Sequence, residues 1–117
     1  PVCNESKGER EVAKFLTSSG IEFEREKRFN DLVYRGEMEV DFYIESLRAI
    51  IEYQGKQHYV AVDYFGGEEH LEDMNRRDET KRKWCKAKGI RLIEIPYWED
   101  VPRFLSEKLL LNETIIG

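Results

Sequence analysis

The chain has 117 residues and a mass of 13.9 kDa, which is the size of a single domain. Hydrophobic residues make up 40% of it, including two Trp, six Tyr and six Phe, which is enough for a compact core and argues against intrinsic disorder. No apolar run approaches the roughly 20 residues that span a bilayer, so a membrane protein is not expected, and the net charge of -5 by itself argues against a nucleic-acid partner.

A helix followed by a strand is predicted at the N-terminal end. Ser6 and Glu9 have the Ser-x-x-Glu spacing of a capping box, and Gly20 is placed to end the helix, so we expect it over residues 9–19. Its apolar stripe consists of Val12, Phe15 and Leu16. Residues 21–29 then alternate between apolar and charged side chains, as a half-buried strand does.

Two stronger strands are predicted next. Residues 38–44 and 49–54 are rich in Val, Ile, Phe and Tyr, which favour strands, and Ser46 and Leu47 form a short turn between them. These two strands are therefore expected to pair as a hairpin, and residues 55–67 indicate a loop after it.

The rest of the chain predicts a long helix, a short strand and a last helix. The long helix covers residues 68–88 and stops at Gly89, and the strand covers residues 90–95. Asp100 can cap the last helix. Together the elements predict the order α-β-β-β-α-β-α and an α/β fold in which helices flank a mixed central sheet.

The predicted hairpin places two carboxylates opposite each other. With its tip at Ser46 and Leu47, Asp41 lies opposite Glu52, and Gln54 shares the face of Glu52 because side chains alternate along a strand. The other face is apolar and consists of Val40, Phe42, Ile44, Ile51 and Tyr53. Like charges in such a pair destabilise the sheet, and their pKa values are pushed apart unless a cation lies between them.

A divalent metal would remove this conflict. Oxygen ligands from Asp41, Glu52 and the Gln54 amide suit a hard ion such as Mg²⁺, with Mn²⁺ as a substitute. Two alternatives stay open: the register slips, or one carboxylate faces solvent. His58 follows the second strand of the hairpin by four residues; it is either a surface side chain or a group that activates a water or protonates a leaving oxygen.

The long helix carries polar residues on the face that should pack against the sheet. That face consists of Leu71, Met74, Asp78, Lys81 and Cys85. Asp78 and Lys81 either form a simple i,i+3 ion pair, or Asp78 overhangs the metal centre and holds an ion, a water or His58. Glu9 has a similar ambiguity, because the capping box explains it fully and yet its carboxylate can point inward.

Basic residues gather in the same helix. Between Arg76 and Arg91 there are eight Lys or Arg residues and two acidic ones. This segment is either a solvated helix face or a strip that faces phosphates beside the acidic centre. In the second interpretation the candidates for contacts with a DNA backbone are Arg76, Arg77, Lys81 and Arg82.

The residues of the hairpin resemble the PD-(D/E)xK nuclease superfamily. The superfamily pattern is an Asp on one strand and an acidic-x-polar triplet on the next, which reads here as Asp41 followed by Glu52-Tyr53-Gln54, with Gln where the superfamily most often has Lys. The resemblance implies a restriction-endonuclease-like fold and Mg²⁺-dependent hydrolysis of DNA phosphodiester bonds that leaves a 5′-phosphate. Asp41 and Glu52 would then bind the metal, with the Gln54 side chain or the Tyr53 carbonyl completing the site.

One branch of this superfamily is a closer match. It contains the very-short-patch repair endonucleases and the phage intron-encoded homing endonucleases, whose pattern Glu, Asp, x, His, Asp is matched by Glu9, Asp41, His58 and Asp78, with Gln54 as the choice for x. The sequences of residues 50–58, 88–95 and 97–99 also resemble sequences found in proteins of this branch. His58 would act as general base or general acid, and Glu9 and Asp78 would orient a water, His58 or a second ion. Two cysteines cannot build the structural zinc site of the repair enzymes, so the homing or phage type is favoured.

The resemblance also implies a partner and a setting. We expect residues 1–117, which begin with Pro1, to be one nuclease catalytic domain cut from a longer protein with a separate DNA-binding region. Double-stranded DNA is the expected partner, a homodimer would allow both strands to be cut, and the low cysteine content indicates a reducing cytoplasm, in a bacterial host or of a phage-encoded protein. The alternatives are a non-catalytic nucleic-acid-binding module with a nuclease fold and a repair or restriction endonuclease.

Overall fold

The computed structural model describes residues 6–56, 59 and 67–110 of the chain. Its elements are α1 (Lys7–Ser18), β1 (Glu24–Val33), β2 (Glu37–Ile44), β3 (Ala49–Gln54), α2 (Gly67–Lys88), β4 (Arg91–Pro96) and α3 (Val101–Leu105). A short helical turn, η1 (Glu45–Leu47), joins β2 to β3, and η4 (Ser106–Leu110) extends α3. The chain is thus a mixed α/β protein. Of the helices in this part of the chain, none combines the length and apolar composition that a membrane crossing requires.

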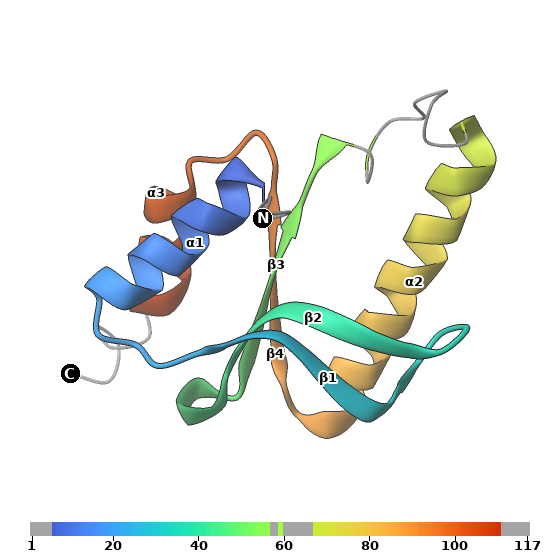
Figure 1. The fold of residues 1–117 in the computed structure, drawn as a ribbon, viewed down its shortest axis with the longest axis horizontal. Coiled ribbons are helices and arrows are strands. Elements are labelled where there is room, and N and C mark those ends of the chain that lie inside the picture. Colours follow the sequence, from blue (N-terminus) through green and yellow to red (C-terminus); the bar gives the residue numbers. More distant parts are fainter. Residues whose placement is uncertain (1–5, 57–58, 60–66, 111–117) are drawn as a thin grey trace, which may run out of the picture.

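The four strands form one mixed sheet in the order β1-β2-β3-β4 (Figure 1). β2 pairs antiparallel with both β1 and β3, whereas β3 and β4 are parallel, with α2 in the connection between them. In the hairpin of β2 and β3, Tyr43 pairs with Ile50 and Ile44 pairs with Ala49. This confirms the predicted register.

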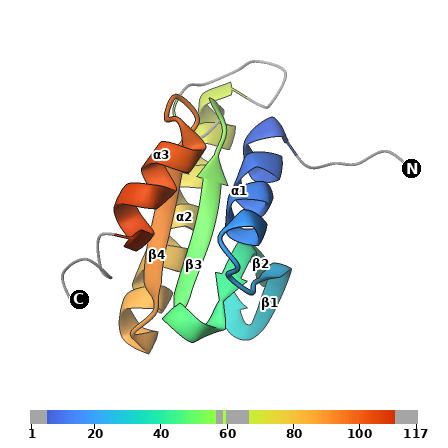
Figure 2. The ribbon, with the colours of Figure 1, turned by 90° about the vertical axis from the view of Figure 1, so that its left-hand side faces the viewer.

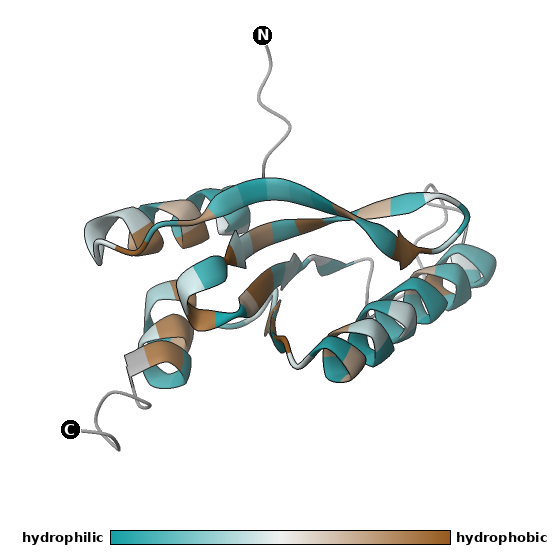
Figure 3. Cartoon of the chain, turned by 90° about the horizontal axis from the view of Figure 1, so that it is seen from below, coloured by the Kyte–Doolittle hydropathy of each residue, from teal (hydrophilic) through white to brown (hydrophobic). Residues whose placement is uncertain are grey.

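The helices cover the two faces of the sheet separately. α1 and α3 lie on one face and α2 lies on the other (Figures 1 and 2). The larger core lies under α1 and α3; its fully buried residues include Leu16, Phe42, Ile44, Ile51 and Leu105. The smaller core lies on the α2 side of the sheet and includes Leu32, Val40, Ile50 and Cys85. Most of α2 is hydrophilic (Figure 3), so this helix buries only part of its surface.

The ends of the helices follow local capping rules. The Glu9 N–H donates to Ser6 Oγ at 3.1 Å, and Glu9 Oε1 accepts from the Ser6 N–H at 3.3 Å, so the capping box is formed and α1 begins at Lys7. Asp100 caps α3 by accepting a hydrogen bond from the Arg103 N–H at 3.2 Å.

The strand predicted over residues 21–29 begins later than expected. β1 starts at Glu24 and continues to Val33. The reason lies in the end of α1, because Gly20 takes a φ of +74° and the Ile21 N–H donates to the Leu16 carbonyl at 2.9 Å. The residues just after the helix therefore complete its C-terminal cap before the strand can begin.

The prediction that Val40 lies on the apolar face of Phe42 is wrong. Val40 packs in the core on the α2 side, whereas Phe42 and Ile44 pack under α1 and α3. The ladder between β2 and β3 ends at the pair Phe42 and Ile51, and beyond it β2 continues its pairing with β1. Because this half of β2 turns away with β1 instead of staying flat beside β3, the alternation of side chains does not carry through Asp41.

Candidate functional site

Most of the predicted site residues line one cavity of about 230 Å³ between the sheet, the start of α1 and the first half of α2. Its walls are formed by Glu9, Glu39, Asp41, Glu52, Tyr53, Met74, Arg77, Asp78 and Lys81. Five carboxylates and two basic side chains thus face the same space. The structure therefore brings together side chains from α1, β2, β3 and α2 that are far apart in the sequence.

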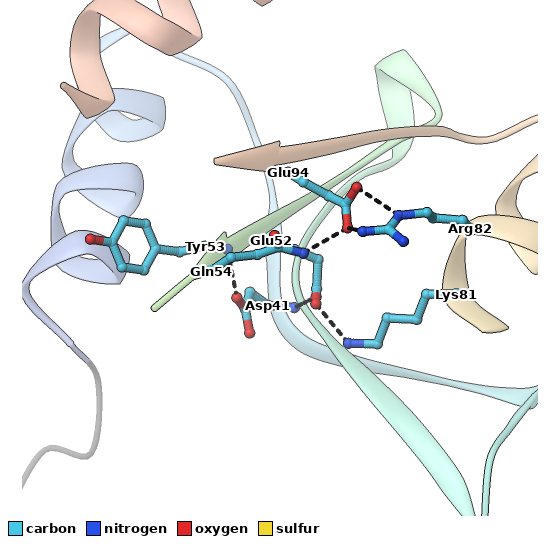
Figure 4. A network of polar contacts seen from close by, with 7 residues as sticks. All are labelled: Asp41, Glu52, Tyr53, Gln54, Lys81, Arg82 and Glu94. Carbon is cyan, nitrogen blue, oxygen red and sulfur yellow. Dashed lines mark hydrogen bonds and ion pairs between the residues drawn. The ribbon is translucent and has the colours of Figure 1, made fainter. Parts of the chain in front are cut away.

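The cavity opens where β2 and β3 part. Beyond the pair Phe42 and Ile51, the Asp41 N–H donates to Glu52 Oε2 at 2.8 Å, and the Tyr53 N–H donates to Asp41 Oδ2 at 2.9 Å (Figure 4). Each carboxylate satisfies an amide of the opposite strand that would otherwise lack its partner in the ladder. The two acidic side chains therefore close the end of the hairpin, and both line the cavity.

Lys81 reaches this carboxylate pair from α2. Its Nζ lies 2.6 Å from Glu52 Oε1, and the two side chains are only 11% and 8% exposed (Figure 4). Asp78, about one turn earlier in α2, is also buried. The polar residues that interrupt the packing face of the long helix thus lie over the carboxylates of the hairpin.

The pKa of Asp41 is raised by burial and by the acidic groups around it. Burial raises the pKa of Asp41 to about 8, and the nearby charges of Glu52 and Glu9 act in the same direction. The hydrogen bond from the Tyr53 N–H and the positive charge of Lys81 lower this pKa, but by less. The sequence predicted that Asp41 and Glu52 would shift each other's pKa, and the pKa of Asp41 is indeed raised. Lys81 pairs with the other member, Glu52.

α1 brings Glu9 to the cavity through a close helix–strand contact. Tyr53 points toward α1 (Figure 4), and its ring lies so close to Gly8 that a Cβ at that position would overlap it. Glycine therefore allows the start of α1 to approach β3, and the next residue, Glu9, lines the cavity. Glu9 fills both roles that the sequence left open, because it completes the capping box and also faces inward.

Gln54 belongs to a separate network beside the cavity. Its Nε2 donates to Glu94 Oε2 at 2.6 Å, and its Oε1 accepts from the Tyr59 hydroxyl at 2.7 Å. Arg82 donates to both oxygens of Glu94, at 3.0 and 3.1 Å (Figure 4). Gln54 is not among the described residues that line the cavity. Its role as a metal ligand stays a prediction, and it would require Tyr59 to release the amide oxygen.

The four basic candidates on α2 occupy three different surroundings. Arg77 lines the cavity, and Lys81 is paired inside it. Arg82 is held by the carboxylate of β4, outside the cavity. Arg76 lies toward the turn between β1 and β2, where the Tyr34 hydroxyl beside it raises the pKa of its guanidinium.

Two acidic residues of this region were not identified from the sequence. Glu39 lies two residues before Asp41 on β2, lines the cavity and pairs with Arg28 at 3.1 Å. Glu94 lies beside Glu52 in the parallel register of β3 and β4. Glu94 could have been noticed in the sequence, because it is a charged residue inside an otherwise apolar strand. His58 lies outside the described residues, so its predicted role stays a prediction.

The donor chemistry of the cavity fits Mg²⁺, although not as a complete protein cage. Among the described residues, no three His, Cys, Asp or Glu side chains are arranged to hold a metal ion together. Asp41 and Glu52 nevertheless supply hard oxygen donors within an excess of negative charge. Mg²⁺ is usually bound through one or two carboxylates, with waters and substrate phosphates as its other ligands. Two carboxylates at the parting strands satisfy that requirement.

Comparisons with known proteins give relatives of undetermined function. No protein-family model matches the chain. Uncharacterized protein 094L of Frog virus 3 (isolate Goorha) is 39% identical over 112 residues, which cover 91% of this chain and 72% of the relative. Uncharacterized protein 033L of Invertebrate iridescent virus 3 is 32% identical over 112 residues, covering 90% of this chain and 58% of the relative. Uncharacterized protein 307L of Invertebrate iridescent virus 6 is 38% identical over 74 residues, covering 62% of this chain and 38% of the relative.

These three relatives are viral proteins, and the expected source in a bacterium or a phage stays a prediction. The first of them is similar over nearly the whole chain and over most of its own length. The chain therefore belongs to the family of viral proteins that includes uncharacterized protein 094L of Frog virus 3.

Proposed function

We propose that this chain is the catalytic domain of a Mg²⁺-dependent DNA endonuclease with a restriction-endonuclease-like fold, of the homing or phage type. The observation that carries the proposal is the meeting of Asp41 and Glu52 at the point where β2 and β3 part, with Lys81 against Glu52. Burial and the charges of Glu52 and Glu9 raise the pKa of Asp41 to about 8, and a cation bound between the two carboxylates would offset that effect, which supports the proposal.

Two groups of side chains divide the work in this proposal. Asp41 and Glu52 would hold a Mg²⁺ ion, which, when bound, acts as a Lewis acid toward the scissile phosphate. Glu9 and Asp78 line the same cavity and can accept hydrogen bonds from a water beside the phosphate. His58 is the proposed general base or general acid.

Basic groups in the cavity would bind the phosphate. Gln54 replaces the lysine that most members of the superfamily carry at the end of the triplet, and Lys81 brings an ammonium group to the carboxylates from α2 instead. Arg77 lines the cavity as well, so its guanidinium can contact a backbone phosphate that enters. Double-stranded DNA is the proposed substrate, and a homodimer would supply the second site needed to cut both strands.

A second candidate function is a non-catalytic nucleic-acid-binding module. The observation that favours it is that both oxygens of Glu52 already have protein partners, Lys81 Nζ on one and the Asp41 N–H on the other. If this second function is correct, Asp41 and Glu52 only stabilise the hairpin and its contact with α2. The basic residues of α2 would then matter for binding, and the loss of Asp41 would not.

Plasmid cleavage separates the two functions. We expect the chain to nick or linearise supercoiled plasmid in Mg²⁺ and not in EDTA, and Asp41→Asn to reduce cleavage to the level in EDTA because it removes a metal ligand. Asp31→Asn is the matched control, since Asp31 is an exposed aspartate paired with Lys88 away from the cavity. A chain that binds the plasmid but leaves it intact in both Mg²⁺ and Mn²⁺ would instead support the binding module.

A further inference from the structure

Lys81 and Glu52 form a buried ion pair at the centre of the proposed site. Lys81 Nζ lies 2.6 Å from Glu52 Oε1, while Glu52 Oε2 accepts from the Asp41 N–H. Both residues are buried. A buried carboxylate needs such a partner, because an unpaired charge in the interior is strongly disfavoured. The position next to Glu52 that the ammonium group occupies is therefore one in which the buried carboxylate favours a positive charge.

A second cation at Glu52 would conflict with the ammonium group. Two positive charges on one buried carboxylate repel each other, and the repulsion is stronger there than in water. Lys81 has a flexible four-carbon stem, so its ammonium group can move while α2 stays in place. The same cavity has room for the displaced group and for an entering anion, since it measures about 230 Å³ and is also lined by Arg77.

We propose that Lys81 is an internal counter-ion that takes the place of a divalent cation at Glu52, and that Mg²⁺ binds by displacing its ammonium group. The inference rests on the proposed function, because it takes Mg²⁺ as the occupant of the site. The displaced ammonium then faces the cavity, where a phosphate oxygen is its natural partner. Cation binding and phosphate binding thus become coupled, each making the other tighter by the same factor.

The proposed displacement is tested directly by measuring the Mg²⁺ affinity of a variant that lacks the charge of Lys81. Lys81→Met removes the competing ammonium group, so we expect the affinity for Mg²⁺, measured by isothermal titration calorimetry without DNA, to rise roughly tenfold or more. The matched control is Lys83→Met, which removes the same charge from an exposed position of the same helix. The affinity of that variant should change by less than about twofold, because an exposed charge is screened by solvent.

Nuclear magnetic resonance on the wild-type chain tests the displacement even if Lys81→Met does not fold. With ¹³Cε and ¹⁵Nζ labels in lysine, the Lys81 signal is assigned by its absence in Lys81→Arg. Titration with Mg²⁺ should shift the Lys81 signal in proportion to binding and leave the Lys83 signal in place. Mg²⁺ binding that leaves the Lys81 signal unchanged would overturn the displacement.

The outcomes distinguish this inference from the proposed function. Tighter Mg²⁺ binding by Lys81→Met but not by Lys83→Met supports the counter-ion role. If the wild type binds Mg²⁺ and cleaves DNA, equal or weaker binding of Mg²⁺ by Lys81→Met overturns the counter-ion role alone. If neither the wild type nor Lys81→Met binds Mg²⁺ or Mn²⁺, the proposed metal site itself fails, and the inference fails with it.

Discussion

The core that α1 and α3 cover consists of hydrophobic residues, whereas the face of the sheet under α2 combines a smaller apolar cluster with the buried polar residues Glu52, Asp78 and Lys81. Burial of apolar side chains stabilises a fold, while burial of charged groups destabilises it unless they are paired. The two faces therefore differ in what they contribute. The face under α1 and α3 stabilises the fold. The burial of charged groups on the face under α2 offsets part of this stabilisation and keeps those groups together in a low-dielectric cavity.

The comparison also shows how a small domain can carry such a site. Phe42 and Asp41 are neighbours on β2, yet one packs under α1 and α3 and the other enters the cavity. Since adjacent residues of a strand face opposite sides, a single hairpin can serve both faces at once. Substitutions at these two positions should then have effects of different kinds.

Breaking the apolar face should have the largest effect on stability. Phe42 is fully buried, and its ring lies 5.7 Å from that of Phe23. We expect Phe42→Ala to lower the free energy of unfolding by about 3–5 kcal/mol, because it leaves a cavity in a packed core. Urea denaturation followed by circular dichroism measures this. The control Leu47→Ala, at a site that is 50% exposed, should stay within about 0.5 kcal/mol of the wild type.

Removing a charge from the polar face should change how stability depends on pH. Asp41 has a pKa of about 8 in the folded chain and 3.8 as its ordinary value, so the folded state keeps a proton that the unfolded state loses between these pH values. In the absence of divalent metal, this residue makes the wild type less stable as pH rises from about 4 to about 8, because the unfolded state releases the proton in this range and the folded state keeps it. Asp41→Asn removes this contribution.

The measurement is urea denaturation of wild type and Asp41→Asn at several pH values in EDTA. The stability of Asp41→Asn relative to the wild type should rise with pH across that window and level off above pH 8. Asp31→Asn is the opposite control, because the hydrogen bond from Lys88 lowers the pKa of this exposed carboxylate and its effect lies below pH 4. A difference between wild type and Asp41→Asn that does not vary with pH would contradict the raised pKa.

The smallest effect is expected where the polar face meets solvent. Arg77 lines the cavity, while Arg76 lies beside Tyr34, so the proposed function predicts that, of these two arginines, Arg77 contacts a phosphate in the site and Arg76 does not. Arg77→Ala should weaken binding of a short DNA duplex about fivefold, or about 1 kcal/mol, and Arg76→Ala should weaken it less. Fluorescence anisotropy at one fixed salt concentration measures both. Equal losses would indicate that only the net charge of α2 matters.

Local rules were sufficient for much of this chain. The capping box of Ser6 and Glu9 and the cap at Asp100 depend on residues three positions apart, and both are formed. The register of β2 and β3 follows from a tight turn and an apolar pattern, so the closeness of Asp41 and Glu52 could be predicted. These features need few distant contacts.

The predictions that failed or stayed incomplete depended on distant contacts. The face of Val40 changes because β2 leaves β3 and follows β1. The amide of Gln54 is taken by Glu94, which is 40 residues away, and by Tyr59. Alternation along one strand could not identify either partner. It predicts which side of the sheet a side chain faces, but not which atoms form hydrogen bonds with it.

The sequence by itself determined the helices, the N-terminal caps of α1 and α3, the hairpin register and the two carboxylates that face each other across it. The tertiary structure decided which cation pairs with Glu52, because Lys81 lies 29 residues from Glu52 and reaches it only when α2 packs across the sheet. It also decided that Glu9 enters the cavity, through the contact of Gly8 with Tyr53. Local patterns fix the conformation of a segment, whereas the charge balance of a buried site depends on every segment that packs against it.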